Sequence, residues 1–215
     1  MKAEHDEITR DFRAELGEVR CWDAGVQAVF DERGEPVVDC SLQNREELIG
    51  LCEFIARHHI RSYLEIGTWT GGTVRALHRL FDFDTLAVCD HGWVRSLGLE
   101  VRLPAAAQLF EGDSDSDDFL RWREALGPID LVMIDANHRY HAVRRDLEIN
   151  RRFPHRFLAF HDITGANRHT TGVRRLWSEL TGWKHEICRP HTELGLDHSV
   201  MGIGIWAASA PVELP

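Results

Sequence analysis

Carboxylates and a histidine follow successive short apolar runs of the chain, and their types suit proton transfer and metal binding. Asp135 comes directly after one run, and His161 with Asp162 after the next. A neutral imidazole such as that of His161 or His138 can act as a general base near pH 7. Alternatively, Asp135, His161 and Asp162 can hold a divalent ion such as Mg²⁺, which lowers the pKa of a bound hydroxyl. The sequence leaves both chemistries open.

A glycine-rich turn, residues 67–73 (Gly-Thr-Trp-Thr-Gly-Gly-Thr), follows an earlier apolar run. No Lys-Ser/Thr pair follows the glycines, so the turn is not a P-loop, and three residues separate Gly67 from Gly71 where a dinucleotide fingerprint has one. Glycines at a strand end let the backbone approach a ligand closely. The turn therefore indicates a nucleoside ligand more than a pyrophosphate.

Acidic residues at other strand ends support a nucleoside. Asp90 follows the second predicted strand, where a carboxylate can accept hydrogen bonds from two ribose hydroxyls. Asp113 follows the third, where it can accept from an adenine amino group. With Glu65 and Asp135 at two further strand ends, these acids are expected along one edge of the sheet.

The elements that must position these residues alternate between apolar runs and stretches of helical periodicity. Apolar runs without polar alternation, separated by helices, predict a parallel sheet covered on both faces. The last two runs have no helix between them, which favours an antiparallel pair at the edge. The predicted strands are 62–66, 85–89, 108–111, 129–134, 157–161, 183–188 and 201–206.

The patterning sharpens at Asn44, which with Glu47 makes a capping-box signature. Apolar residues then recur at helical spacing up to Ile55, so a helix is expected to end near His59. We divide the chain into an N-terminal lead segment, residues 1–43, and one domain, residues 44–215.

Together these motifs resemble the class I S-adenosylmethionine-dependent methyltransferases over residues 44–206. The resemblance is carried by Glu65-Ile66-Gly67-Thr68 with Gly71-Gly72-Thr73, by Asp90, by Gly112-Asp113-Ser114 and by Ile134-Asp135-Ala136-Asn137-His138. It implies an α/β fold with a Rossmann-like, doubly wound sheet of seven strands, order 3-2-1-4-5-7-6, strand 7 antiparallel. The spacing from Asp135 to His138 and Tyr140, with His161-Asp162 after the next strand, is similar to small O-methyltransferases of the macrocin and cephalosporin-pathway type.

The resemblance also implies roles for individual residues. Glu65, Gly67 and Gly71 would line the methionine part of S-adenosylmethionine, Asp90 would hold the ribose, and Asp113 with Ser114 the adenine. The whole implied cofactor set is Glu65, Gly67, Thr68, Trp69, Gly71, Gly72, Asp90, Asp113, Ser114 and Asp135. Ala136-Asn137 replaces the usual Gly and acid, and residues 153–156 stand where a Pro-Gly-Gly turn is common, so the acceptor side matches less closely.

Composition excludes several other classes of protein. The 215 residues include 25 basic and 35 acidic side chains, and the net charge of −10 disfavours nucleic acid as a partner. No apolar run approaches the ~20 residues of a membrane span, and the charged N-terminus is unlike a signal peptide. Five cysteines without a CxxC pair indicate reduced thiols. We expect a cytoplasmic protein without a membrane partner, and its oligomeric state stays open.

The sequence thus favours S-adenosylmethionine-dependent methyl transfer, with a hydroxyl of a small molecule as the acceptor and N-methylation as a further option. One alternative is a nicotinamide-dependent oxidoreductase, against which the glycine spacing and the antiparallel edge pair argue. The other is a non-catalytic protein that retains the cofactor-binding fold. The acids at the strand ends argue against this, because a scaffold does not need them.

Overall fold

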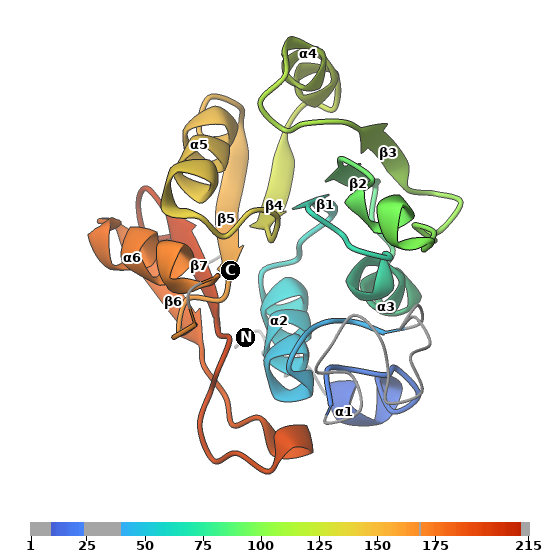
Figure 1. Cartoon of the computed structure of the whole chain (residues 1–215), viewed down its shortest axis with the longest axis vertical. Helices are drawn as coiled ribbons and strands as arrows, with labels where there is room; N and C mark the ends of the chain where they lie inside the picture. The colour runs from blue at the N-terminus through green and yellow to red at the C-terminus, as the bar shows by residue number, and fades with distance from the viewer. Residues whose placement is uncertain (1–9, 24–39, 168, 212–215) are drawn as a thin grey trace, which may run out of the picture.

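A computed structural model describes residues 10–23, 40–167 and 169–211 (Figure 1). Its centre is a seven-stranded sheet in the order β3-β2-β1-β4-β5-β7-β6. The strands are β1 Ser62–Ile66, β2 Thr85–Asp90, β3 Gln108–Glu111, β4 Ile129–Ile134, β5 His155–His161, β6 Trp183–Ile187 and β7 Ile203–Ala207. The helices are α1 Phe12–Glu15, α2 Arg45–Arg57, α3 Gly72–Leu80, α4 Asp117–Ala125, α5 Tyr140–Asn150 and α6 Thr171–Glu179, with 3₁₀ turns η2 Trp93–Leu97 and η3 Thr192–Leu194.

The topology confirms the predicted α/β fold. Strands β1 to β5 pair in parallel, whereas β7 pairs antiparallel with both β5 and β6. The predicted last strand, 201–206, is shifted, because Met201 and Gly202 lie before β7. Gly202 has φ +77°, and its N–H donates to Glu47 outside the sheet.

Two hydrophobic cores lie on opposite faces of the sheet. One joins α1, α2 and α3 to residues such as Leu131 and Met133 of β4. The other joins α4, α5 and α6 to the alternate residues Val132 and Ile134 of the same strand. Because side chains alternate between the faces of a strand, helices on both faces explain why central strands such as β4 carry buried apolar residues on both faces.

The predicted capping box is correct for one of its two members. The Asn44 side chain caps α2 by accepting from the Glu46 N–H at 3.0 Å. Glu47 is fully buried, and its carboxylate instead accepts from the Arg189 N–H, the Ser199 hydroxyl and the Gly202 N–H. The capping-box interpretation is therefore wrong for Glu47, which fixes the connection between β6 and β7.

The described part of the predicted lead segment shares its core with the domain. Phe12 and Leu16 are buried in the same core as α2 and α3. The Ser41 and Thr73 hydroxyls lie 2.8 Å apart, and a Cβ on Gly72 would lie 1.9 Å from the Cys40 carbonyl oxygen. This segment therefore packs directly on the glycine-rich turn, while the boundary at residue 43 stays a prediction.

Cysteine and helix properties agree with the composition. All five cysteines are free, and Cys188 is exposed whereas the other four are buried. Within the described ranges, no helix is both long and apolar enough to cross a bilayer.

Candidate active site

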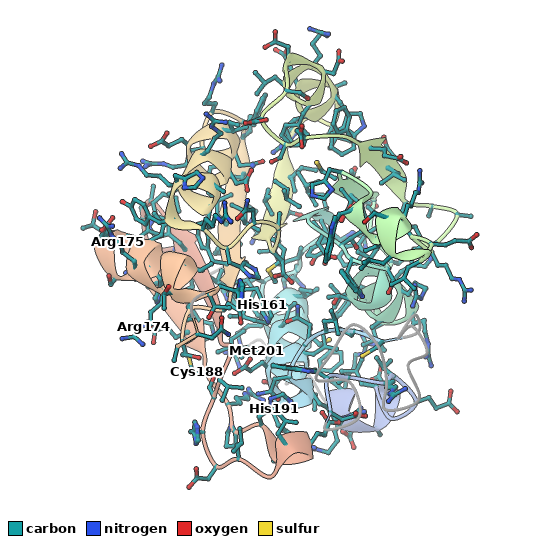
Figure 2. The ribbon with its side chains drawn as sticks, viewed as in Figure 1. His161, Arg174, Arg175, Cys188, His191 and Met201 are labelled. Atoms are coloured by element: carbon teal, nitrogen blue, oxygen red, sulfur yellow. The ribbon has the colours of Figure 1, made fainter. Side chains whose placement is uncertain are left out.

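A cavity of about 1150 Å³ opens at the carboxyl ends of the parallel strands. We call its two sides the turn half, formed by residues at and just after the ends of β1, β2 and β3, and the histidine half, formed by residues at and just after the ends of β4 and β5. In Figure 2, His161 and Met201, both in the cavity wall, lie near the centre of the molecule, whereas Arg174 and Arg175 lie on the outer side of α6. The predicted site residues thus gather at one edge of the sheet.

In the turn half, the glycines are required by the backbone itself. Gly67 has φ +82°, and a Cβ there would lie 2.5 Å from the Asp135 carbonyl oxygen. Gly71 has φ +85°, and its Cβ would lie 2.4 Å from the Arg102 carbonyl oxygen. Trp69, between them, adopts φ +53°, which is uncommon for a non-glycine residue and costs of order 1–3 kcal/mol. The turn is therefore held tightly against neighbouring backbone at the cavity wall.

Glu65 lies buried beneath this turn. Its carboxyl group accepts hydrogen bonds from the Tyr63 hydroxyl at 2.7 Å and the Thr68 hydroxyl at 2.8 Å. Burial raises the pKa of Glu65 to about 7, although both hydrogen bonds act in the opposite direction. A cation placed near this carboxyl group would favour its ionised form and so interact with it favourably.

Asp90 and Ser114 are held by hydrogen bonds at the next two strand ends. Asp90 accepts from the Thr68 N–H at 3.0 Å and the Gly92 N–H at 2.6 Å, so it ties the first turn to the second. Asp113 is exposed at the cavity rim, and the Ser114 hydroxyl donates to Asp146 at 2.5 Å.

Asp146 of α5 is a cavity residue that sequence reasoning missed. It is buried, and burial raises its pKa to about 6. The sequence does contain a signal for Asp146. It falls between Val143 and Leu147 on the apolar face of the helix, where a buried acid needs a hydrogen-bond partner.

Aromatic rings border the turn half. The rings of Trp69 and Trp93 lie 5.4 Å apart at an interplanar angle of 50°, and Trp93 is 49% exposed. Trp22, from the N-terminal segment, also lines the cavity. An exposed tryptophan pair beside a cavity offers a flat apolar surface to a ring.

In the histidine half, one carboxylate organises three side chains. Asp135 Oδ1 lies 3.1 Å from His138 Nε2 and 3.0 Å from His161 Nδ1. Its Oδ2 accepts from Gln43 Nε2 at 3.1 Å. Because a carboxylate only accepts, Gln43 must present its NH₂ group here, and its Oε1 is buried without a hydrogen-bond partner in the described part of the chain.

The charged groups of this cluster shift the pKa values of one another. Burial alone would raise the pKa of Asp135, but the imidazoles of His161 and His138 hold it below its usual range. Burial opposes protonation of both histidines, yet Asp135 and Asp162 raise the pKa of each. Asp162 has φ +66° and places Oδ2 3.4 Å from His138 Nδ1. Both His138 nitrogens therefore face carboxylates, whereas His161 Nε2 is buried without a hydrogen-bond partner among the described residues.

The geometry allows a metal to be held by a set that differs from the predicted one. Asp135, His138 and His161 each offer a ligand atom, and these atoms all lie within 4.8 Å of one another. Asp162, in the predicted set, places its Oδ2 3.4 Å from His138 Nδ1 and 4.0 Å from His161 Nδ1. The unpaired His161 Nε2 fits a role as a ligand atom, and two imidazoles with one carboxylate suit Fe, Mn or Zn better than Mg²⁺.

Gln43 and Met201 are further cavity residues that no motif indicated. Gln43 lies 92 positions from its partner Asp135, and Met201 lies before the last strand. Neither stands in a local pattern that carries chemistry, so only the tertiary packing brings them to the cavity.

Comparison with known proteins agrees with this arrangement. Residues 64–163, which run from β1 past Asp162, match the sequence model of a family described as a methyltransferase domain. The sheet order with an antiparallel β7 is consistent with a Rossmann-like methyltransferase fold. No curated protein matches the sequence.

Solved structures with the methyltransferase fold are similar to this chain. An O-methyltransferase from Bacillus cereus, in complex with SAH, has 17% identity and a TM-score of 0.54, covering 80% of this chain and 84% of that chain. The O-methyltransferase TomG from Streptomyces achromogenes, involved in tomaymycin synthesis and in complex with SAM, has 19% identity and a TM-score of 0.51, covering 79% and 82%. At these identities the likeness concerns the fold.

Proposed function

We propose that the protein transfers a methyl group from S-adenosylmethionine to a hydroxyl group of a small molecule. The observation that carries the proposal is the Asp135 cluster, in which two histidines share one carboxylate oxygen and His161 Nε2 is buried and unpaired. It stands in one cavity with the glycine-rich turn. The methyltransferase-domain match and the antiparallel β7 favour this reaction over a nicotinamide-dependent oxidation.

The turn half is assigned to the cofactor, which supplies an electrophilic methyl group on a sulfonium. Glu65 offers a carboxyl group to the ammonium of the methionine part, and Asp90 lies at a strand end where it can accept from ribose hydroxyls. Asp113 and Ser114 lie at the next strand end, beside Asp146, where amino-group recognition of adenine requires an acceptor. The cavity of about 1150 Å³ has room for both cofactor and acceptor.

The histidine half is assigned to the acceptor. Methyl transfer from a sulfonium is an in-line displacement, so the protein must align the acceptor and take its proton. In the neutral form of His161, the Nδ1–H donates to Asp135 and the lone pair lies on Nε2. That nitrogen has no hydrogen-bond partner among the described residues, and it is the atom to which we assign the acceptor proton. His138 is the second candidate base.

A divalent ion is the alternative means of activating the acceptor. Asp135, His138 and His161 would hold it, and when bound it would lower the pKa of an acceptor hydroxyl. Asp162, which the sequence predicts as a ligand, would contact His138 at Nδ1.

The spacing of Asp135, His138 and Tyr140, followed by His161-Asp162, supports a place near the macrocin-type O-methyltransferases. The cytoplasmic location stays a prediction, and the oligomeric state stays open.

Calorimetry with S-adenosylmethionine, S-adenosylhomocysteine and NADH tests the proposal. We expect binding of both sulfur compounds and none of NADH; failure of both sulfur ligands to bind would overturn the proposed function. Turnover of methyl-labelled cofactor with hydroxylated metabolites, measured with and without excess chelator, separates the two activation routes. Full turnover in chelator eliminates the metal, and loss of turnover that added Mn²⁺ restores supports it.

A further inference from the structure

A second, smaller cavity adjoins the histidine half. It has a volume of about 550 Å³ and is lined by Ala136, Asn137, His138, Arg139 and His169. The first four residues also line the main cavity, and His138 belongs to the Asp135 cluster. A molecule that reaches the cluster can therefore extend into this second cavity.

The second cavity contains hydrogen-bond donor side chains but no acidic side chain among its described lining residues. None of the described residues that line it is acidic, whereas seven acidic residues line the main cavity. Asn137 Oδ1 accepts from the Arg139 N–H at 3.1 Å, which leaves the Asn137 NH₂ group as a donor. The cavity thus differs in charge from the turn half of the same protein.

Arg139 is the cation in this cavity that nothing neutralises. Of the two arginines that line the main cavity, Arg145 pairs with Asp115, whereas the Arg139 guanidinium has no ion-pair or hydrogen-bond partner among the described residues. Elsewhere on α5 and α6, Arg144 pairs with Glu148 and Arg175 with Glu179. An unpaired guanidinium presents a planar set of donors that matches an oxyanion.

Resting on the proposed function, we infer that the methyl acceptor is an anionic small molecule whose carboxylate or phosphate is bound by Arg139 in the second cavity. Arg139 follows His138 directly, so their Cα atoms lie about 3.8 Å apart. An anion held at Arg139 thereby anchors one end of the acceptor beside the Asp135 cluster, where its hydroxyl loses the proton. The acceptor class follows from the charge of the cavity.

Binding with defined probes tests this inference in the presence of saturating S-adenosylhomocysteine. The carboxylate probes are the three hydroxybenzoates, each compared with its neutral hydroxybenzamide, and glycerol phosphate is compared with glycerol. We expect at least one anion to bind about tenfold or more tightly than its neutral counterpart, because charged hydrogen bonds are worth more than neutral ones. Which pair shows the difference tells a carboxylate acceptor from a phosphate.

The variant Arg139→Gln should remove this preference and leave S-adenosylhomocysteine affinity unchanged. Arg174→Gln is the matched control, because Arg174 is also exposed but lies on the outer side of α6, away from both cavities (Figure 2). It should keep the preference. Equal binding of anions and neutral probes, or a preference that survives in Arg139→Gln, would overturn the inference. S-adenosylhomocysteine that fails to bind the wild type contradicts the proposed function itself.

Discussion

The two halves of the cavity differ in how far apart along the chain their residues lie. The turn half comes from the ends of β1, β2 and β3 and the short turns after them, joined by bonds such as that from the Thr68 N–H to Asp90, 22 positions away. The histidine half includes a hydrogen bond between residues much farther apart in the sequence, because Gln43 and Asp135 are separated by 92 positions. The contacts of Asp135 with His138 and His161 form between the ends of the adjacent strands β4 and β5, whereas the hydrogen bond from Gln43 forms only once the N-terminal segment has packed on the sheet.

The turn half and the second cavity differ in charge as well. Glu65, Asp90, Asp113 and Asp146 surround the turn half, whereas the second cavity beside the histidine half contains Arg139 and no acid among its described residues. The acidic residues of this chain, whose net charge is −10, are therefore unevenly distributed around the site. A cationic sulfonium compound suits the first region and an anion suits the second.

The largest expected effect is in the histidine half. Asp135→Asn removes the charge that orients His138 and His161, so methyl transfer should fall by about 10³-fold, within the range of general-base effects. Labelled-methyl transfer measures the loss, and calorimetry should show S-adenosylhomocysteine still binding. Equal loss of both properties would show that the halves are not separable.

Gly67→Ala tests the turn half. An alanine at φ +82° with its Cβ 2.5 Å from the Asp135 carbonyl oxygen forces the backbone to move, so S-adenosylhomocysteine should bind about 100-fold more weakly. Gly98→Ala is the control, because Gly98 has φ +74° but nothing within 4 Å of the added Cβ. If both variants bind alike, the close approach of β1 and β4 does not shape the site.

Gln43→Leu removes the hydrogen bond to Asp135 while keeping a buried side chain of similar size. Loss of one hydrogen bond to a charged group predicts a fall of about tenfold in kcat, with cofactor affinity unchanged. Gln108, exposed on the edge strand β3, provides the matched control Gln108→Leu. Unchanged kcat in Gln43→Leu would remove Gln43 from the site.

The smallest effect concerns pH. The pKa of Glu65 is raised to about 7, so its carboxyl group is neutral below this pH and ionised above it. An ammonium binds the ionised form better, so S-adenosylhomocysteine affinity should rise by roughly tenfold from pH 6 to pH 8. Glu65→Gln should abolish this rise, and 5′-methylthioadenosine, which lacks the ammonium, should not show it. A rise that persists in Glu65→Gln assigns the effect to another group.

The same contrast explains what the sequence could predict. The strands 62–66, 108–111 and 129–134 were predicted with the bounds that the structure has, because each is a short segment containing adjacent apolar residues and followed by turn residues. The strand ends also placed Asp135 and His161 correctly near one another. These features depend on local patterns and on the rule that parallel strands share an edge.

Other features depend on partners that are distant along the chain. Asn44 and Glu47 form a valid capping-box pattern, yet Glu47 bonds to residues 189–202, because a buried carboxylate takes the donors that packing brings to it. Likewise, Gln43 is one polar residue among many until its NH₂ group meets Asp135. No single sequence pattern encodes such a meeting.

The buried carboxylate of Glu47 has a consequence for the order of events during synthesis. Its donors lie 142 to 155 positions later in the chain, so α2 is made long before anything can satisfy its acid. Until the connection to β7 leaves the ribosome, Glu47 must stay in water, since an unpaired carboxylate is costly to bury. The packing of α2 against the connection between β6 and β7 is therefore expected to be completed late in folding.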